Sequence, residues 1–422
     1  MIGHYLWLAA TAGAVSLLTP CVFPMIPITV SYFSNSASNG LRSALVFAGA
    51  IIGAFTGLGV ALALVFGAAG VQRFAANPWL NVGLTVLFVA FALNLFGFYE
   101  IVLPSRALTA LDNAARDREA AGAHTAGAVL MGLTFALTSF TCTAPFVGTV
   151  LVTAATGAWR EPALGMLAYS TVFALPFFVL ALIPRWAARL PKAGKWLVTV
   201  KVVMGFLELA AAIKFLSNAD LVWHWGIFTR DVVLALWIAL SGLTAAYLVA
   251  SGPGAVGRLA GAAAALGFGI WLATGLVGRS LGELESFLPP KPGERDSYVL
   301  NLNWHLNDLQ SAMLIAKTES KPVFIDFTGY TCTNCRWMEA NVFARPEVKA
   351  ELNHFALARL FTDGDGPVYE TQQAYQEKTF NTVALPLYAV LAPDGHTIAT
   401  LPGLTRDPAV FLAFLEKSAS VQ

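Results

Sequence analysis

Four cysteines carry the most reactive side chains of this sequence, and two of them form a Cys-x-x-Cys motif. Cys332 and Cys335 directly follow an apolar segment typical of a β-strand and begin a segment with helical spacing. A helix N-terminus presents unpaired N–H groups and the positive end of the helix dipole, and therefore stabilises a thiolate. We expect Cys332, the outer thiol, to be the attacking nucleophile and Cys335, one turn further in, to be the resolving thiol.

The same two cysteines could instead form half of a zinc site. Zinc would need two more ligands at suitable spacing. The nearest histidine is His354, and the sequence has no second Cys-x-x-Cys pair. The pattern therefore favours redox chemistry over metal binding.

Two acidic residues lie on either side of the motif. Asp326 stands in the middle of the apolar strand Val323–Phe327, where a helix above the strand would bury it. A buried carboxyl has a raised pKa and could exchange a proton with Cys335, whereas an Asp on an edge strand would face water. Glu339 follows Cys335 by four residues and returns to the same helix face. It could modulate the thiols or simply be solvated.

A proline precedes a later predicted strand. Pro386 follows Leu385 and stands before Leu387–Leu391. If the peptide bond before this proline is cis, it would bring backbone beside the dithiol.

The other two cysteines lie in long apolar segments. Cys21 and Cys142 are each followed three residues later by a proline, Pro24 and Pro145. Proline removes a helical hydrogen bond and kinks a span, and unwound backbone at membrane depth survives only where it lines protein or water. The prolines therefore predict a polar cavity that reaches the two thiols. The alternative is that each buried cysteine is only a small apolar side chain.

Most of the chain is too apolar for a soluble enzyme. Of 422 residues, 57% are hydrophobic and only 12% are charged, whereas soluble domains carry about 25% charged residues. Four cysteines are also too few for a disulfide-stapled secreted scaffold. A bilayer span takes about 20 apolar residues. We predict eight spans: His4–Phe33, Leu41–Gly67, Trp79–Val102, Thr125–Thr156, Ala163–Ile183, Trp196–Leu216, Val232–Ala250 and Val256–Val277.

The basic residues of the loops predict the orientation. Each loop is counted together with the first three residues of the span that follows it. Counted in this way, the loops after odd-numbered spans hold nine basic residues, including Arg42 and Arg258, and the loops after even-numbered spans hold three. Basic loops stay in the cytoplasm. Both termini and the C-terminal part would then lie outside, in the periplasm of a bacterium.

The two membrane cysteines also mark an internal repeat. Each Cys-x-x-Pro lies within a long span, the first and the fourth, so the repeat unit is three helices. An odd unit inserts its second copy upside down, which places the two thiols near each other at the midplane. Two such short matches could also arise by coincidence.

Ionisable residues interrupt the sixth predicted span. Lys201 and Lys214 lie near enough to its ends to extend towards the interface, and only Glu208 is central. Groups of this kind inside a membrane are candidates for function.

The last part of the chain has ordinary soluble composition. Residues 1–279 carry 15 basic and 8 acidic residues, and residues 280–422 carry 11 and 17. Residues 280–303, which include Pro289–Gly293, predict a semi-stiff linker. Strands then alternate with helices, followed by a hairpin around Pro393–Gly395 and a closing helix, Pro408–Lys417. This order predicts a small α/β domain over residues 304–422.

These motifs together resemble a known family. Phe324–Cys335 (FIDFTGYTCTNC), with Pro386 before a later strand, resembles the thioredoxin superfamily. Because it follows spans that contain Thr19–Pro27 (TPCVFPMIP) and Thr141–Pro145 (TCTAP), nearly the whole chain resembles DsbD-type thiol:disulfide interchange proteins. The resemblance implies a multi-pass α-helical membrane protein with a thioredoxin-like C-terminal domain. Glu339 matches an acid that this family keeps near its dithiol.

The resemblance also implies a route for electrons. Cytosolic thioredoxin would reduce a Cys21–Cys142 disulfide in the inner membrane, and that dithiol would reduce Cys332–Cys335 outside. The outer dithiol would reduce periplasmic proteins, such as a disulfide isomerase or a cytochrome c maturation thioredoxin. No flavin, quinone or metal would be needed, because each step is thiol–disulfide exchange. Residues 1–279 would then be the electron-transfer domain.

Two features depart from the family pattern. The long form of the family begins with an immunoglobulin-like periplasmic domain that has its own cysteine pair, and we expect this chain to lack it. Tyr330-Thr331 also replaces the tryptophan often found before the first cysteine. This second departure bears on the choice of substrate rather than on the chemistry.

Two other classes of function compete with this interpretation. A metal-handling membrane protein would use the cysteines as soft ligands, and an inert anchored chaperone would not need them. The sequence contains no Gly-rich phosphate loop and no basic patch for nucleic acid. The strand-then-helix context of Cys332, together with Asp326 and Pro386, favours thiol exchange.

Overall fold

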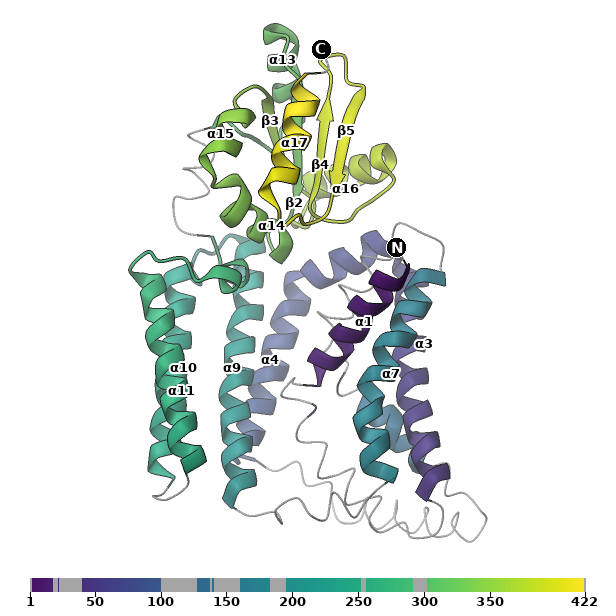
Figure 1. Cartoon of the computed structure of the whole chain (residues 1–422), viewed down its shortest axis with the longest axis vertical. Coiled ribbons are helices and arrows are strands. Elements are labelled where there is room, and N and C mark those ends of the chain that lie inside the picture. Colours follow the sequence, from purple (N-terminus) through teal and green to yellow (C-terminus); the bar gives the residue numbers. More distant parts are fainter. Residues whose placement is uncertain are drawn as a thin grey trace. The chain divides into compact units, whose positions relative to one another are not determined.

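The structure is a computed structural model of the whole chain. It describes residues 2–17, 22, 40–99, 127–136, 139, 160–182, 195–251, 256–290 and 302–420. The described part contains a set of long apolar helices and, after residue 301, an α/β domain (Figure 1).

Each of the eight predicted spans overlaps a helix of the described part. The helices are α1 (Ile2–Ser16), α3 (Gly40–Ala76), α4 (Pro78–Leu95), a short helix at Gly127–Ala136, α7 (Arg160–Leu182), α9 (Lys195–Trp223), α10 (Arg230–Ala250) and α11 (Val256–Leu276). Within the described residues, α3, α4, α10 and α11 each hold a segment long and apolar enough to cross a membrane. The number of eight spans and the inverted repeat stay predictions.

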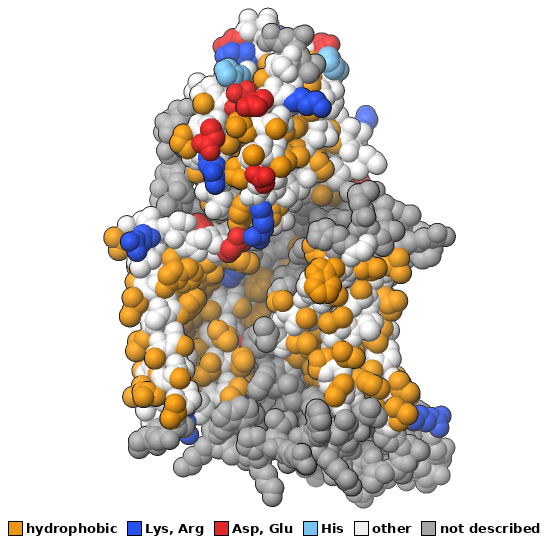
Figure 2. Space-filling view, viewed as in Figure 1, with side chains coloured by type: hydrophobic (Ala, Val, Ile, Leu, Met, Phe, Trp, Pro, Cys, Tyr) orange, Lys and Arg blue, Asp and Glu red, His pale blue; other side chains and the backbone are white. Residues whose placement is uncertain are grey.

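The apolar helices expose hydrophobic side chains to their surroundings. On α10 and α11, Leu243, Leu259 and Ile270 are all more than half exposed. Figure 2 shows apolar side chains over α10 and α11, whereas charged side chains gather on the α/β domain. A soluble protein rarely exposes so large an apolar surface, so these faces suit contact with lipid.

An aromatic core joins α1, α3, the helix at Gly127–Ala136 and α7. Phe55, Phe135 and Phe173 are buried in it with ring centroids about 5 to 6 Å apart. Helix α1 lies directly against α7, because a Cβ on Gly13 would lie 2.5 Å from the carbonyl oxygen of Tyr169. Close approach at a small residue is a common way for helices to associate in a membrane.

A buried ion pair connects α10 and α11 to the segment that follows them. Arg230, at the start of α10, donates two hydrogen bonds to Glu285, at 2.7 and 3.2 Å, and a third to the carbonyl of Gly275 in α11. Glu285 belongs to the 3₁₀ helix η1 (Gly282–Phe287). Residues 282–287 of the predicted linker therefore have regular structure.

The C-terminal domain is built around one mixed sheet. Its strands are β1 (His305–Leu306), β2 (Val323–Thr328), β3 (Ala356–Phe361), β4 (Leu387–Leu391) and β5 (Thr397–Pro402), in the order β1-β3-β2-β4-β5. β1, β3 and β2 are parallel, whereas β4 and β5 are antiparallel to their neighbours. Its helices are α13 (Leu309–Glu319), α14 (Thr333–Met338), α15 (Pro346–Leu352), α16 (Pro367–Phe380) and α17 (Pro408–Ala419).

Strand β2 is the centre of this domain. All six of its residues are buried, which explains the continuous apolar run in the sequence. Val323, Ile325 and Phe327 face the core with α13 and α16, whereas Phe324 faces the core with α15 and α17. The period of two in a strand therefore places Asp326 on the same face as Phe324.

The predicted elements of this domain are confirmed, with three local differences. The strand β1 and the helix α15 were not predicted from the sequence. With only two residues, β1 is too short to show the alternation of buried and exposed side chains that marks a strand. The helix that the sequence predicts at the Cys-x-x-Cys motif begins at Thr333 and changes to a π-helix over Glu339–Phe343. The extra residue per turn of a π-helix breaks the 3.6-residue pattern on which a helix prediction depends.

The aromatic packing on β2 predicts the effect of a core truncation. Phe324 is fully buried and contacts five aromatic rings, including Tyr388 and Phe411. Phe324→Ala should lower the free energy of unfolding of this domain by about 3 to 5 kcal/mol, because it leaves a cavity. Urea titration of the detergent-solubilised chain, with 5-fluorotryptophan at Trp304 observed by ¹⁹F NMR, measures this. Leu314→Ala, at a 65% exposed position of α13, is the control and should change it by less than about 0.5 kcal/mol.

Candidate functional site

The Cys-x-x-Cys motif lies where β2 leads into α14, and its two sulfurs form a disulfide. The Cα atoms of Cys332 and Cys335 are 5.3 Å apart, a normal separation for a bonded pair. Cys332 is the N-cap of α14, and its Sγ accepts a hydrogen bond of 3.1 Å from the backbone N–H of Cys335. Cys332 is half-buried and Cys335 is only 2% exposed. The outer and inner positions expected from the sequence are confirmed.

Asp326 is buried on the face of β2 that it shares with Phe324. Its side chain is 3% exposed, and its Oδ2 accepts a hydrogen bond of 2.8 Å from Nε of Arg359. Asp326 and Arg359 are direct neighbours across the parallel pair β2–β3. Burial raises the pKa of Asp326 to about 6, although Arg359 acts in the opposite direction. The interpretation of Asp326 as a buried acid is confirmed, and the edge-strand alternative is wrong.

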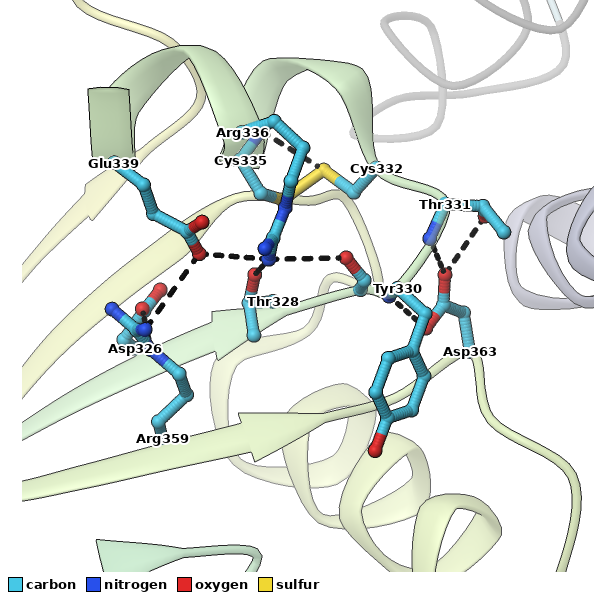
Figure 3. Close-up of polar contacts among 11 residues, drawn as sticks. Asp326, Thr328, Tyr330, Thr331, Cys332, Cys335, Arg336, Glu339, Arg359 and Asp363 are labelled. Atoms are coloured by element: carbon cyan, nitrogen blue, oxygen red, sulfur yellow. Dashed lines mark hydrogen bonds and ion pairs between the residues drawn. A yellow bond between two sulfur atoms is a disulfide. The ribbon is translucent and has the colours of Figure 1, made fainter. Parts of the chain in front are cut away.

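Glu339 is not solvated, because two guanidinium groups hold it. Its Oε1 lies 2.7 Å from Arg336 and 3.8 Å from Arg359, and its side chain is 13% exposed. Figure 3 shows Asp326, Arg359, Glu339 and Arg336 as one chain of polar contacts beside the disulfide. The carboxylate of Glu339 also contributes to the raised pKa of Asp326, since two nearby negative charges repel each other.

Pro386 stands where the sequence placed it, before β4. The peptide bond between Leu385 and Pro386 is cis. The carbonyl of Pro386 accepts a hydrogen bond of 2.8 Å from the N–H of Gly403, and Leu385 packs in the same apolar cluster as Cys335.

Two residues near the disulfide were not predicted from the sequence. Arg359 is a lone cation within the apolar strand β3, and its guanidinium lies 4.4 Å from the ring centroid of Trp304. Asp363 follows β3 and accepts hydrogen bonds from the two residues that precede Cys332. A charged residue in a buried strand was the signal for Arg359, whereas nothing local marked Asp363.

The remaining predicted site residues lie outside the described residues. These are Cys21, Pro24, Cys142 and Pro145. The central acid of the sixth span is described: Glu208, in α9, is 1% exposed, and its Oε2 has no hydrogen-bond partner within the described part of the chain.

Comparison with known protein families assigns both parts of the chain. Residues 4–219 match the family described as the cytochrome C biogenesis protein transmembrane domain, and residues 303–393 match a thioredoxin-like family. The first match covers half of the chain. The chain belongs to the cytochrome c biogenesis transmembrane family. It is therefore a membrane protein of this family with a thioredoxin-like C-terminal domain.

Several relatives of this family member are described as thiol:disulfide interchange proteins. The chain is 31% identical to DsbD 2 of Pseudomonas aeruginosa over 84% of its own length and 60% of that protein. It is also 31% identical to the DsbD proteins of Vibrio vulnificus and Vibrio cholerae, over 83% and 90% of its length and 57% and 61% of theirs. The chain thus spans about three fifths of the length of these curated relatives.

The geometry suits thiol exchange in this family member. The thioredoxin-like domain offers a reachable sulfur at a helix N-terminus, a buried second sulfur and a buried acid with a raised pKa. Within the described residues, no three His, Cys, Asp or Glu side chains lie close enough together to hold a metal ion.

The raised pKa of Asp326 predicts how stability depends on pH. The folded state favours the neutral acid, so this contribution is fully present below the unfolded pKa near 4 and is lost as the pH rises through about 6. The loss is on the order of 3 kcal/mol, because each pKa unit corresponds to about 1.4 kcal/mol. Asp326→Asn should therefore flatten the fall in stability between pH 4 and pH 7, measured by the same ¹⁹F urea titration. Glu347→Gln, at an exposed position of α15, should leave the slope of the wild type unchanged.

Proposed function

We propose that this chain is a thiol–disulfide oxidoreductase that carries reducing equivalents across the bacterial inner membrane. The observation that carries the proposal is the Cys332–Cys335 disulfide, with one half-buried sulfur at the N-cap of α14 and one buried sulfur. The membrane part matches a family whose relatives are named thiol:disulfide interchange proteins. Redox-active disulfides would be the only redox groups required.

The outer reaction follows from the positions of the two sulfurs. In the dithiol state, the thiolate of Cys332 attacks one sulfur of a target disulfide. The target S–S bond breaks, its other sulfur leaves as a thiolate and takes a proton, and a mixed disulfide forms on Cys332. The sulfur of Cys335 then attacks the Sγ of Cys332 and releases the second target thiol. Two electrons pass to the target, and the Cys332–Cys335 disulfide forms again.

Asp326 is the proton acceptor that we propose for this second step. Cys335 must lose its proton to attack, and it is buried away from water. The carboxyl of Asp326 is buried on the sheet beneath α14, and its pKa of about 6 lets it accept and release a proton near neutral pH. Glu339 and the two arginines that hold it keep a second charge beside Asp326 and so tune its proton affinity.

The membrane part would supply electrons to this domain. We propose that cytosolic thioredoxin reduces a Cys21–Cys142 disulfide and that the resulting dithiol reduces Cys332–Cys335. The matched Cys-x-x-Pro motifs support two thiols that meet near the midplane, with Pro24 and Pro145 opening the backbone there. Because exchange needs direct contact between sulfurs, the pair must be reachable from each side in turn.

The domain organisation and orientation complete the proposal. Residues 1–279 form the electron-transfer domain, residues 280–303 connect it, and residues 304–422 act in the periplasm on protein disulfides. The nine-to-three excess of basic residues in the odd-numbered loops supports this orientation. The acceptors would be thiol–disulfide proteins that serve disulfide isomerisation and cytochrome c maturation. The comparisons give no support to the metal-handling alternative.

Trapping of the mixed disulfide tests the outer reaction. Cys335→Ala should leave a target protein bound covalently to Cys332, because the resolving thiol is gone. Membranes are prepared from cells that contain the periplasmic proteins and are run on a gel without dithiothreitol, where the adduct appears as an additional band. The band should disappear when the same sample is treated with dithiothreitol. Cys332→Ala is the matched control and should trap nothing. The same small amount of adduct in both variants would contradict the assignment of Cys332 as the nucleophile.

The redox state of the four cysteines in cells tests the relay. In cells with cytosolic thioredoxin, Cys332 and Cys335 should be labelled by a maleimide as free thiols. In cells without it, and in Cys21→Ala or Cys142→Ala, they should be found as the disulfide, because no electrons arrive. If Cys332 and Cys335 stay reduced in all of these strains, the proposed donor and the membrane relay are wrong.

A further inference from the structure

The turn that precedes Cys332 is held by one buried carboxylate. Asp363 accepts hydrogen bonds from the backbone N–H of Tyr330 at 2.6 Å, from the backbone N–H of Thr331 at 2.9 Å and from the hydroxyl of Thr331 at 2.8 Å. Figure 3 shows both backbone contacts and the hydroxyl contact converging on this carboxylate. The side chain of Asp363 is buried, with 6% of the residue exposed.

The turn ends on the nucleophile itself. The N–H of Cys332 points back to the carbonyl of Gly329 at 3.4 Å, so residues 329–332 form a single turn between β2 and α14. Asp363 accepts from the two N–H groups in the middle of this turn, and Cys332 is its last residue. Any shift of the turn therefore shifts the Cβ of Cys332, to which the reacting sulfur is attached.

Gly329, the first residue of the turn, lies directly against the carboxylate of Asp363. A Cβ on Gly329 would lie 2.6 Å from Oδ2 of Asp363 and 2.8 Å from its Cγ. Any other residue at position 329 would therefore push the carboxylate away. Glycine here is required by the close approach of Asp363 rather than by an unusual backbone angle.

Strand β3 holds Asp363 in place beneath the turn. Phe361, the last residue of β3, stacks on the ring of Tyr330 with centroids 4.2 Å apart and ring planes 14° apart. The N–H of Thr362 donates to the carbonyl of Thr328 at 3.0 Å, which continues the β2–β3 pairing to the turn. The end of β3 thus contacts the turn through the ring of Phe361 and the carboxylate of Asp363.

We propose that Asp363 is a positioning residue for Cys332. It touches neither sulfur in the described contacts and acts through the turn that it holds. With the turn fixed, the sulfur of Cys332 stays within bonding reach of Cys335, which favours the disulfide over the dithiol. This inference rests on the proposed function, because it concerns the same exchange reaction. In the step that it affects, Cys335 attacks the Cys332 sulfur of the mixed disulfide, the Cys332–Cys335 bond forms, and the target leaves as a thiol.

Loss of the carboxylate should make the pair easier to reduce. Asp363→Ala should shift the equilibrium between disulfide and dithiol about tenfold towards the dithiol, which corresponds to about 30 mV. Asp363→Asn should shift this equilibrium at least about threefold in the same direction. The amide oxygen can accept a hydrogen bond from one backbone N–H, but the NH₂ group is a donor and cannot accept from the other. The measurement equilibrates the full chain in detergent with a series of oxidised and reduced dithiothreitol ratios. Alkylation and peptide mass spectrometry then give the oxidised fraction of Cys332–Cys335.

Matched variants separate positioning from a general effect on the fold. Asp365→Asn changes an exposed carboxylate two residues further on and should leave the equilibrium unchanged. Thr331→Val removes only the hydroxyl donor and should give a smaller shift than Asp363→Asn, while Thr331→Ser keeps the hydroxyl and should match the wild type. Gly329→Ala should reproduce the shift of Asp363→Ala. The double variant Gly329→Ala/Asp363→Ala should shift no further than either single variant, because both remove the same contact.

The outcomes also distinguish this inference from the proposed function. If the wild-type pair never exchanges with dithiothreitol, the proposed function fails. If the wild type exchanges, and Asp363→Asn and Asp363→Ala are folded by ¹⁹F NMR of Trp304 but keep the wild-type equilibrium, only the positioning role is overturned. If the Asp363 variants do not fold, Thr331→Val and Gly329→Ala decide: a shift supports the role, and a wild-type equilibrium in both overturns it.

Discussion

Two carboxylates and two guanidinium groups share a buried space beside the disulfide, and the chemistry of the C-terminal domain depends on their balance. Asp326 and Glu339 would repel each other, and Arg359 and Arg336 offset that repulsion. Burial is the larger effect on Asp326, since its pKa is raised to about 6 despite the arginine next to it. A carboxyl that titrates near neutral pH can both accept and release a proton, which a fully solvated Asp could not do in the same range.

The sheet topology brings these groups together. β2 and β3 are parallel and adjacent, so the Asp in the middle of one strand lies opposite the Arg in the middle of the other. The C-terminal ends of these two strands lie next to each other. There β2 continues into the turn before Cys332, and β3 continues to Asp363. One pair of strands therefore positions both the buried acid and the residue that holds the nucleophile's turn.

The membrane part obeys a different constraint. In lipid, every backbone group must be satisfied within the protein, so the apolar segments form helices and their outward faces are hydrophobic. Buried polar groups are then paired within the protein: the hydroxyl of Tyr169 in α7 donates to Ser16 in α1 at 2.7 Å, and Arg230 of α10 is paired with Glu285 in the segment after α11. Against this background Glu208 on α9 is unusual, because one of its two carboxylate oxygens has no hydrogen-bond partner among the described residues.

The amino-acid sequence by itself determined the two-part architecture, the four described helices that are long and apolar enough to span a membrane, the strand-then-helix placement of Cys332 and Cys335, and the burial of Asp326. These follow from local patterns: apolar runs, alternation along a strand and a Cys-x-x-Cys at a predicted helix start. Only the tertiary structure showed which side chains contact Asp326 and the turn before Cys332. Arg359 is 33 residues from Asp326, and Asp363 is 31 residues from Cys332. Such contacts depend on which strands pair and in which register, and no local pattern in one strand contains that information.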